Sequence, residues 1–213
     1  MTVAILANGE FPSSERTLGY LKQADLIICC DGAAATLLEH GMEPDIITGD
    51  MDSLSPALAQ RFGSIIRKVA EQQTNDLTKA FKAALELNPD TIHILGATGK
   101  REDHTMANVS LLADYVEALS GSNCSIDMPT ESGVFLAFCD KDIQFSCTPD
   151  VEVSIFAFDN TLKIVSEGLL YKTDRVTFDT LWKATLNRSV AGQISLHLNH
   201  QAKVTVFICN PGL

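Results

Sequence analysis

PDIITGDMDSL, residues 44–54, joins a short apolar run to a glycine and two aspartates. The run at residues 45–48 has the length of a buried strand, and Gly49 allows the backbone to turn sharply after it. Asp50 and Asp52 then stand two positions apart at the carboxyl end of that strand. In an open α/β sheet the carboxyl ends of the strands face one shared crevice, where ligands bind. The stretch therefore predicts a parallel strand that delivers carboxylates to a site.

A second segment, TNDLTKAF at residues 74–81, places charged residues at the start of a predicted helix. Thr74 or Asn75 can cap this helix, and Asp76 and Lys79 follow one turn apart. The free N–H groups of a helix start favour anions. Asp76 can reach a metal ion while Lys79 reaches a phosphate, although the same spacing also suits a simple intrahelical ion pair.

A third segment, GATGKREDHT at residues 96–105, follows a predicted strand and precedes a helix. Its glycines allow the backbone to approach a phosphate, and Lys100 and Arg101 add positive charge. The spacing is not that of a Walker loop. Asp103 is expected near the helix start, beside His104, and either side chain is a candidate base.

Carboxylates gathered in one crevice repel one another unless a cation joins them. A hard divalent ion such as Mg²⁺ prefers oxygen ligands and usually arrives with the phosphates of a nucleotide. The three segments together therefore predict phosphoryl chemistry at the end of one sheet.

Strand-like and helical stretches alternate through the first 128 residues. Strands are expected at residues 3–7, 25–30, 45–48, 65–69 and 91–95, and helices at residues 33–40, 75–87 and 103–119. This alternation is typical of an α/β domain with a doubly wound, mostly parallel sheet and helices on both faces.

A different pattern begins near residues 128–133. Strand-like runs at residues 134–139, 151–158, 162–165, 194–198 and 203–209 are separated by turns, and only residues 178–184 resemble a helix. Such a pattern is typical of a β-sandwich or β-barrel. We therefore expect an α/β domain over residues 1–130 and a smaller β-sandwich domain over residues 131–213.

The composition excludes several classes of function. A net charge of -11 over 213 residues argues against nucleic acid and against an anionic membrane surface as partners. No apolar run has the length of a membrane helix, and the amino terminus lacks the pattern of a signal peptide. The six cysteines form no CxxC pair, which predicts reduced, mostly buried thiols in a cytoplasmic protein.

The segments resemble the thiamine pyrophosphokinase family in identity, order and approximate spacing. The similar stretches are CDGAA at 30–34, PDIITGDMDSL at 44–54, QQTNDLTKA at 72–80 and GATGKREDHTMANVSLL at 96–112. EGLLY at 167–171 and GQISLHLN at 192–199 extend the resemblance more weakly. The resemblance implies an ATP-dependent transfer of a pyrophosphoryl group to the hydroxyl of thiamine, which gives thiamine diphosphate and AMP.

The resemblance also implies a role for individual residues. Asp50, Asp52 and Asp76 would bind Mg²⁺. Binding of the nucleotide or its phosphates would fall to Gln72, Asn75, Lys79 and Arg101. Asp103 would lie where the thiamine hydroxyl meets the phosphates, and Asp31 would line the same crevice. Members of the family are homodimers that hold thiamine near the subunit interface, partly through the β-sandwich domain of the partner.

The sequence departs from the family where thiamine should bind. The family often carries Ser-x-Ser-Asn near the end of the chain, whereas this chain has Leu196 and Leu198 before Asn199, with Ser195 one position earlier. Trp182 is the only tryptophan, and a core or an interface role are both open. The departure leaves another small alcohol as an alternative acceptor. A non-catalytic nucleotide or thiamine sensor is a second alternative. A haloacid-dehalogenase-type phosphatase is a third, which the aspartate spacing fits poorly.

Overall fold

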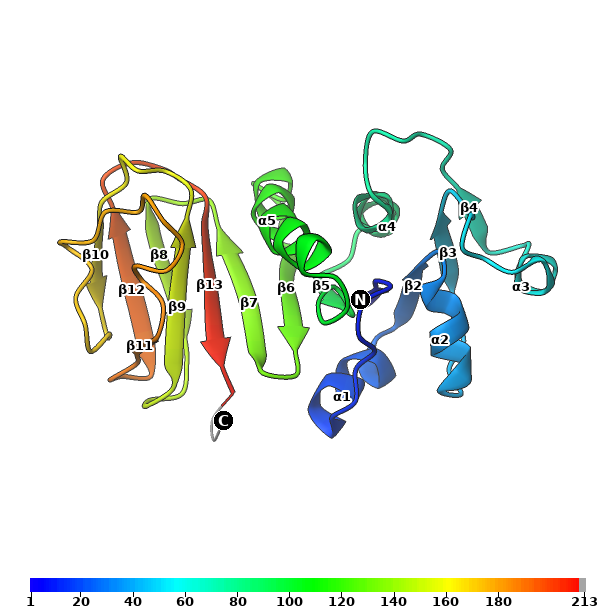
Figure 1. The fold of residues 1–213 in the computed structure, drawn as a ribbon, viewed down its shortest axis with the longest axis horizontal. Helices are drawn as coiled ribbons and strands as arrows, with labels where there is room; N and C mark the ends of the chain where they lie inside the picture. The colour runs from blue at the N-terminus through cyan, green and yellow to red at the C-terminus, as the bar shows by residue number, and fades with distance from the viewer. Residues whose placement is uncertain (211–213) are drawn as a thin grey trace. The chain divides into compact units, whose positions relative to one another are not determined.

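The computed structural model describes residues 1–210, which form two compact units (Figure 1). The first unit comprises residues 1–111 and 121–131, and the second comprises residues 112–120 and the chain from residue 132 onward. Helix α5 begins in the first unit, and its last turns belong to the second.

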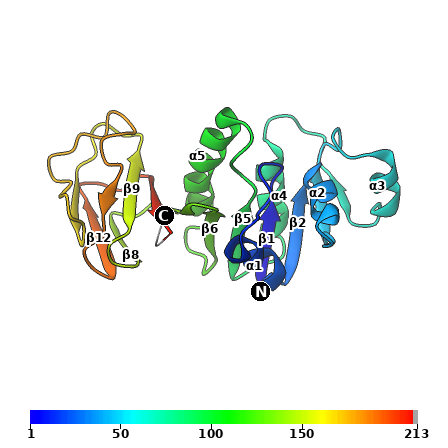
Figure 2. The ribbon, with the colours of Figure 1, turned by 60° about the horizontal axis from the view of Figure 1, so that its bottom comes forward.

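The first unit is built on a parallel sheet in the order β4-β3-β2-β1-β5-β6. Figure 2 shows β2, β1, β5 and β6 side by side in this order. Its strands are β1 (Thr2–Leu6), β2 (Leu26–Cys30), β3 (Ile46–Gly49), β4 (Ile66–Lys68), β5 (Thr91–Leu95) and β6 (Ser125–Thr130). Its helices are α1 (Glu15–Gln23), α2 (Ala33–Glu39), α3 (Pro56–Arg61), α4 (Asp76–Leu85) and the start of α5 (Glu102–Ala118). The strand order reverses beside β1, so the loops after β1, β2, β3 and β5 meet at the crevice of a doubly wound sheet.

Period-two alternation in the strands explains why helices cover both faces of the sheet. Ala4 and Leu6 of β1 pack with Cys29 and Ile47 against a cluster that includes Leu21 of α1 and Leu37 of α2. Their neighbours Val3 and Ile5 point to the opposite face and are fully buried. Helix α4 packs against β1, β2 and β3. The predicted α/β class is confirmed.

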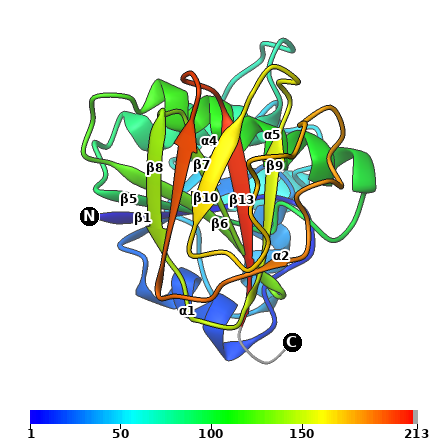
Figure 3. The same ribbon diagram turned by 90° about the vertical axis from the view of Figure 1, so that its left-hand side faces the viewer.

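The second unit contains two antiparallel sheets that share one core (Figure 3). One sheet has the order β11-β9-β13-β7 and the other β10-β12-β8. The strands are β7 (Gly133–Phe138), β8 (Asp142–Ser146), β9 (Glu152–Ala157), β10 (Ile164–Glu167), β11 (Asn187–Arg188), β12 (Gln193–Leu198) and β13 (Val204–Cys209). Val153 and Ile155 of β9 meet Ile194 and Leu196 of β12 in the shared core, which confirms the expected β-rich second part.

Several sequence-based expectations are wrong in detail. Residues 178–184 form turns instead of a helix, because Phe178 and Ala184 are buried in the sandwich core and the Trp182 carbonyl accepts from Thr185. Helix α1 and the strands β6, β8 and β11 were not expected. Helix α1 carries Thr17 and Gly19, and β6 contains a proline, so local propensity indicates neither element strongly.

A side chain from the end of β6 holds the start of α1. The Glu131 carboxylate accepts from the backbone N–H of Ser13 at 2.8 Å and from the hydroxyl of Thr17 at 2.5 Å. Ser14 caps the helix by accepting from the Thr17 N–H. Desolvation alone would raise the pKa of Glu131, but the hydrogen bonds from Thr17, Ser13 and Ser14 outweigh it and lower the pKa to about 2 from an ordinary 4.5.

Replacement of Glu131 by Gln is expected to lower the free energy of unfolding by about 1 kcal/mol at pH 7, with allowance for screening at this exposed site. A lowered pKa means that the ionised group stabilises the fold above pH 4.5 and loses this effect as the pH falls towards 2. Urea unfolding at a series of pH values should therefore show the two proteins converging in acid. Glu15→Gln, which removes a charge from the same helical turn, should change stability by less than about 0.5 kcal/mol. Equal losses of stability in both variants would contradict a stabilising role of the Glu131 carboxylate at the start of α1. A difference in stability between parent and Glu131→Gln that does not change with pH would contradict it as well.

Candidate active site

A cleft of about 440 Å³ opens where the loops after β1, β2, β3 and β5 meet the starts of α4 and α5. It lies in the first unit, at the carboxyl ends of the parallel strands, where a doubly wound sheet binds its ligands. All three segments singled out from the sequence reach it. The expected residues that line it are Asp31, Asp50, Gln72, Asn75, Asp76, Lys79 and Arg101.

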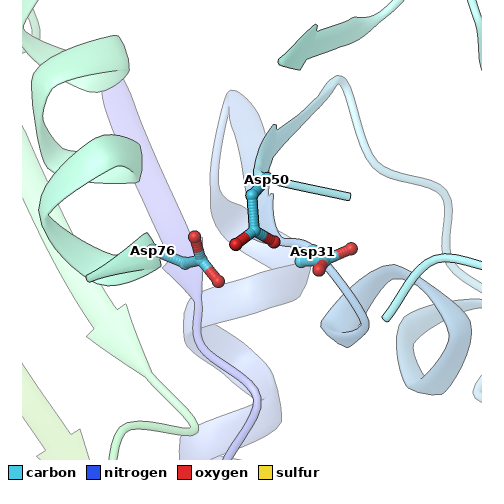
Figure 4. Close-up of side chains that lie close together, drawn as sticks. All are labelled: Asp31, Asp50 and Asp76. Carbon is cyan, nitrogen blue, oxygen red and sulfur yellow. The ribbon is translucent and has the colours of Figure 1, made fainter. Parts of the chain in front are cut away.

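Three carboxylates converge in this cleft (Figure 4). Asp31 follows β2, Asp50 follows β3 and Asp76 opens α4. One oxygen from each lies within 4.8 Å of the others, which is the arrangement of a candidate metal site. Oxygen ligands from carboxylates are those that Mg²⁺ prefers, so the donor set fits a hard divalent cation.

Gly49 makes this convergence sterically feasible. A Cβ at this position would lie 3.0 Å from the Asp31 Cβ and 3.2 Å from the Asp76 Oδ1, and its φ of +153° is one that L side chains rarely adopt. A side chain at position 49 would crowd both aspartates and would be strained at this φ, so glycine is favoured where β3 ends.

Asp31 is the most buried of the three carboxylates, with 3% of the residue exposed. Its Oδ2 accepts from the Ser53 N–H at 3.0 Å, whereas its Oδ1 is buried without a hydrogen-bond partner in the described chain. Burial raises the pKa of Asp31, with further contributions from Asp52 and Asp76, and the Ser53 N–H opposes the shift. A cation bound by this group of three aspartates would give a buried, unpartnered carboxylate oxygen a partner.

Asp50 and Asp52 do not present their carboxylates as an extended strand would. Strand β3 ends at Gly49, and Met51 has a φ of +69°, so the alternation of side chains stops between the two aspartates. Asp50 joins the carboxylate group, and the Gln72 amide that donates to it at 3.0 Å lowers the pKa of Asp50. Asp52 is exposed, accepts from the Ser53 hydroxyl and adjoins Asp31, but it stands outside the group of three.

Lys79 supplies a buried positive charge at the base of the cleft. Only 2% of its side chain is exposed, and its ammonium group donates to Asp76 Oδ1 at 3.0 Å. Burial would lower the pKa of Lys79, but the contacts with Asp76 and Asp50 outweigh it and raise the pKa. The cation is therefore permanent at neutral pH and partly balances the carboxylates.

The loop after β5 provides the basic side of the cleft. Lys100, Arg101 and His104 line it. Arg101 forms a two-pronged ion pair with Asp103, and its Nε donates to Oδ1 at 3.0 Å. This pair lowers the pKa of Asp103 to about 2. Asp103, which stands outside the described lining of the cleft, is therefore a weak base as long as Arg101 holds it.

Two of the three residues expected to contact thiamine, Ser195 and Asn199, lie in the second unit, whereas Asp103 lies in the first. Ser195 is on β12 and accepts from the Gln144 amide at 3.2 Å. Asn199 accepts from the Lys163 N–H at 2.8 Å and donates to the Thr161 carbonyl, so its amide closes a local loop. Trp182 is 71% exposed, which excludes a core role within this chain.

Asn8 after β1 and Asn108 on α5 are among the cleft residues that were not singled out from the sequence. Asn108 has a signal that helical spacing could have revealed, because it continues the series Arg101, His104, Thr105 along one face of α5. Asn8 follows a strand without a motif around it, and only the meeting of β1 with β5 brings it to the site.

The first unit is thus an α/β fold with a carboxylate-lined, partly basic cleft at its topological switch point. The family model of the thiamin pyrophosphokinase catalytic domain matches residues 18–121, and that of the thiamin pyrophosphokinase substrate-binding domain matches residues 133–207. The chain belongs to the thiamin pyrophosphokinase family.

Individual relatives agree with this assignment. A thiamine pyrophosphokinase of Bacillus subtilis is 35% identical over 115 residues, which cover 52% of this chain and 54% of the relative. Thiamine pyrophosphokinase 2 of Oryza sativa is 31% identical over 131 residues, which cover 48% of this chain and 49% of the relative. The matched segments thus span about half the length of these relatives.

Solved structures share the fold along nearly the whole chain. The crystal structure of thiamine pyrophosphokinase from Bacillus subtilis matches with a TM-score of 0.77 and 22% identity, covering 99% of this chain and 100% of the other. Thiamin pyrophosphokinase from Candida albicans matches with a TM-score of 0.80 and 19% identity, covering 98% and 89%. At these identities the likeness concerns the fold.

Asp31→Asn is expected to stabilise the metal-free protein. Because the raised pKa disfavours the ionised form in the fold, Asp31 destabilises the protein progressively above its ordinary pKa of 3.8. The variant should unfold about 2–4 °C higher than the parent at pH 7, and the gain should vanish in acid below the ordinary pKa, where both states are protonated.

Asp50→Asn is the matched control, because the pKa of Asp50 is lowered and its ionised form is favoured. It should not stabilise the metal-free protein. Millimolar Mg²⁺ should raise the thermal midpoint of the parent and have a much smaller effect on either variant. A destabilised Asp31→Asn protein that still responds fully to Mg²⁺ would exclude Asp31 from the metal site.

Proposed function

We propose that this chain transfers a pyrophosphoryl group from ATP to the hydroxyl of thiamine, giving thiamine diphosphate and AMP. The observation that carries the proposal is the cleft in which Asp31, Asp50 and Asp76 converge beside Lys79 and Arg101, in a chain of the thiamin pyrophosphokinase family. Transfer of this kind depends on positioning and charge neutralisation more than on covalent catalysis, and these side chains provide both.

In the proposed reaction the carboxylates of Asp31, Asp50 and Asp76 hold Mg²⁺, with Asp52 adjoining them as a further predicted ligand. An ion held by these carboxylates would supply positive charge that neutralises the phosphates of ATP. The thiamine hydroxyl oxygen attacks the β-phosphorus, the bond from that phosphorus to the oxygen bridging to the α-phosphate breaks, and AMP leaves with the electron pair. Gln72 and Asn75 complete the nucleotide-binding side of the cleft.

Lys79 and Arg101 stabilise the charge that develops during this transfer. Lys79 is held by Asp76 at the base of the cleft and requires little reorganisation, since its side chain is already buried. Arg101 exchanges one carboxylate partner, Asp103, for phosphate oxygens. Its departure releases Asp103, whose pKa then rises towards its ordinary range, so Asp103 becomes able to orient the thiamine hydroxyl or accept its proton. His104 of α5, which lines the cleft, is the other candidate base.

Thiamine is proposed to bind with help from the second unit of a partner chain in a homodimer. The first domain, residues 1–130, would bind the nucleotide, and the second, residues 131–213, would bind thiamine and dimerise. Exposed apolar side chains in the paired segments 168–171 and 182–190 support an interface there: Leu170, Tyr171, Trp182, Leu186 and Val190. Ser195 and Asn199 remain the predicted thiamine contacts.

A different small alcohol is a second candidate acceptor, because the thiamine segment departs from the family pattern. Leu196 and Leu198 are buried in the sandwich core, and the Asn199 amide is engaged by Thr161 and Lys163. Two positions of this segment therefore carry apolar side chains that point into the core, and the amide of the third is already hydrogen-bonded within the chain.

We propose a cytoplasmic location on the basis of the cysteines, all six of which are free. Cys29 and Cys30 are buried and the other four are partly buried. Among residues 1–210, the helices are too short or too polar to cross a membrane.

The test is an assay of the purified protein with ATP, Mg²⁺ and thiamine, with the products separated by chromatography. Equal amounts of AMP and thiamine diphosphate are expected. ADP with thiamine monophosphate would overturn the pyrophosphoryl transfer. Turnover with another alcohol and none with thiamine would establish the second candidate, and Mg²⁺-dependent ATP binding without AMP would indicate a sensor.

Asp76→Asn should lower turnover at least about 100-fold while the protein stays folded, because it removes a metal ligand and the partner of Lys79. The control is Asp90→Asn, which removes a carboxylate next to the amino end of β5. This end of the strand lies away from the cleft, which is at the carboxyl ends of the strands. It should keep near-normal turnover. Near-normal rates for Asp76→Asn with Mg²⁺ would show that the metal assignment is wrong.

A further inference from the structure

Asn108 is a buried polar side chain in the wall of the cleft. It lies on α5, where Arg101, His104 and Thr105 precede it at helical spacing and line the same cleft. Only 9% of the residue is exposed. Asparagine is a poor helix former, and a buried amide must be hydrogen-bonded to be tolerated, so the position calls for a specific partner.

The amide of Asn108 has a partner at each end. Its Nδ2 donates to the Ala97 carbonyl at 2.8 Å, and its Oδ1 accepts from the Asn75 Nδ2 at 3.5 Å. Asn75 in turn caps α4, since its Oδ1 accepts from the Thr78 N–H at 2.9 Å. The Asn108 side chain thus connects the loop that contains Asn75 to the loop that contains Ala97, 22 residues further along the sequence.

Each connected loop carries groups used in the proposed reaction. Asn75 immediately precedes Asp76, and its carbonyl accepts from the Lys79 N–H. Ala97 lies in the turn that leads to Lys100 and Arg101. That turn is also held from the other side, because the Gly9 N–H donates to the Gly96 carbonyl and the Glu10 N–H to the Thr98 carbonyl.

We propose that Asn108 is a positioning residue that fixes the separation between the metal-binding loop of Asp76 and the phosphate-binding loop of Lys100 and Arg101. The inference rests on the proposed phosphoryl transfer, in which cation and guanidinium act on one substrate. The Asn108 amide donates to a carbonyl and accepts from a second amide at the same time, which neither a leucine nor an ionised aspartate side chain can do. A displacement of about 1 Å between such groups can reduce a rate 100-fold.

Asn108→Leu keeps the approximate volume and removes both hydrogen bonds, and Asn108→Asp keeps the acceptor but places a carboxylate against the Ala97 carbonyl. Both variants should lower kcat by about 10–100-fold and change the KM for ATP less than about threefold. The Mg²⁺-induced rise in the thermal midpoint should persist, since no metal ligand is altered. Ser110→Ala, on an exposed position of the same helix, is the matched control and should keep kcat.

Hydrogen–deuterium exchange provides a readout that does not depend on turnover. In Asn108→Leu, amides of residues 74–79 and 96–101 should exchange about tenfold faster together, while those of α2 keep the parent rate. Faster exchange in both loops of a protein that never turns over ATP and thiamine would support the coupling and contradict the proposed reaction. Unchanged exchange, or faster exchange in one loop alone, would overturn the positioning role, as would an unaltered kcat in an active enzyme.

Discussion

Repulsion among three carboxylates is the constraint on which the cleft depends. Asp31, Asp50 and Asp76 approach within 4.8 Å, although like charges at such a distance in a partly desolvated site oppose folding. The fold tolerates the cluster through the Lys79 cation, the Ser53 N–H, the Gln72 amide and the missing side chain of Gly49. The remaining repulsion is a source of affinity for a cation, because binding one relieves it.

The parallel sheet allows three charged side chains to lie close together without burying them in the apolar core. Each aspartate follows or faces the carboxyl end of a strand whose interior is apolar, so the charged atoms sit at the edge of the core. Asp31 and Met51 adopt positive φ values of 37° and 69°, an unfavourable conformation that the surrounding loops impose. The strain at these two residues and the repulsion among the carboxylates therefore occur at the same rim of the sheet, above the buried apolar strands β1, β2 and β5.

In the second unit the inward-facing strand residues form one apolar core between the two sheets. Side chains from the two sheets pack together in this core, among them Val153, Ile155, Ile194 and Leu196. The alternation of side chains along β12 directs Ser195 and His197 outward. Leucines at the two positions where the family resemblance predicts serines are therefore explained by packing in the core. Leu196 and Leu198 are buried in the core between the two sheets, so this segment presents no side chain at these two positions to a ligand.

The sequence by itself determined the class of fold and most of the cleft. Apolar period, turn residues and the aspartate segments identify β2, β3, β5 and α4, because these signals are local and strong. Tertiary structure decided what local pattern does not encode. Asp31 takes the place expected for Asp52 in the group of three, because the chain turns at Met51 after β3 has ended and the pairing of β2 with β3 brings Asp31 beside Asp50. Glu131, more than a hundred residues away, holds the start of helix α1, and residues 178–184 form turns with Phe178 and Ala184 buried in the sandwich core. These outcomes depend on contacts between segments distant in the chain, and no window of sequence contains both partners.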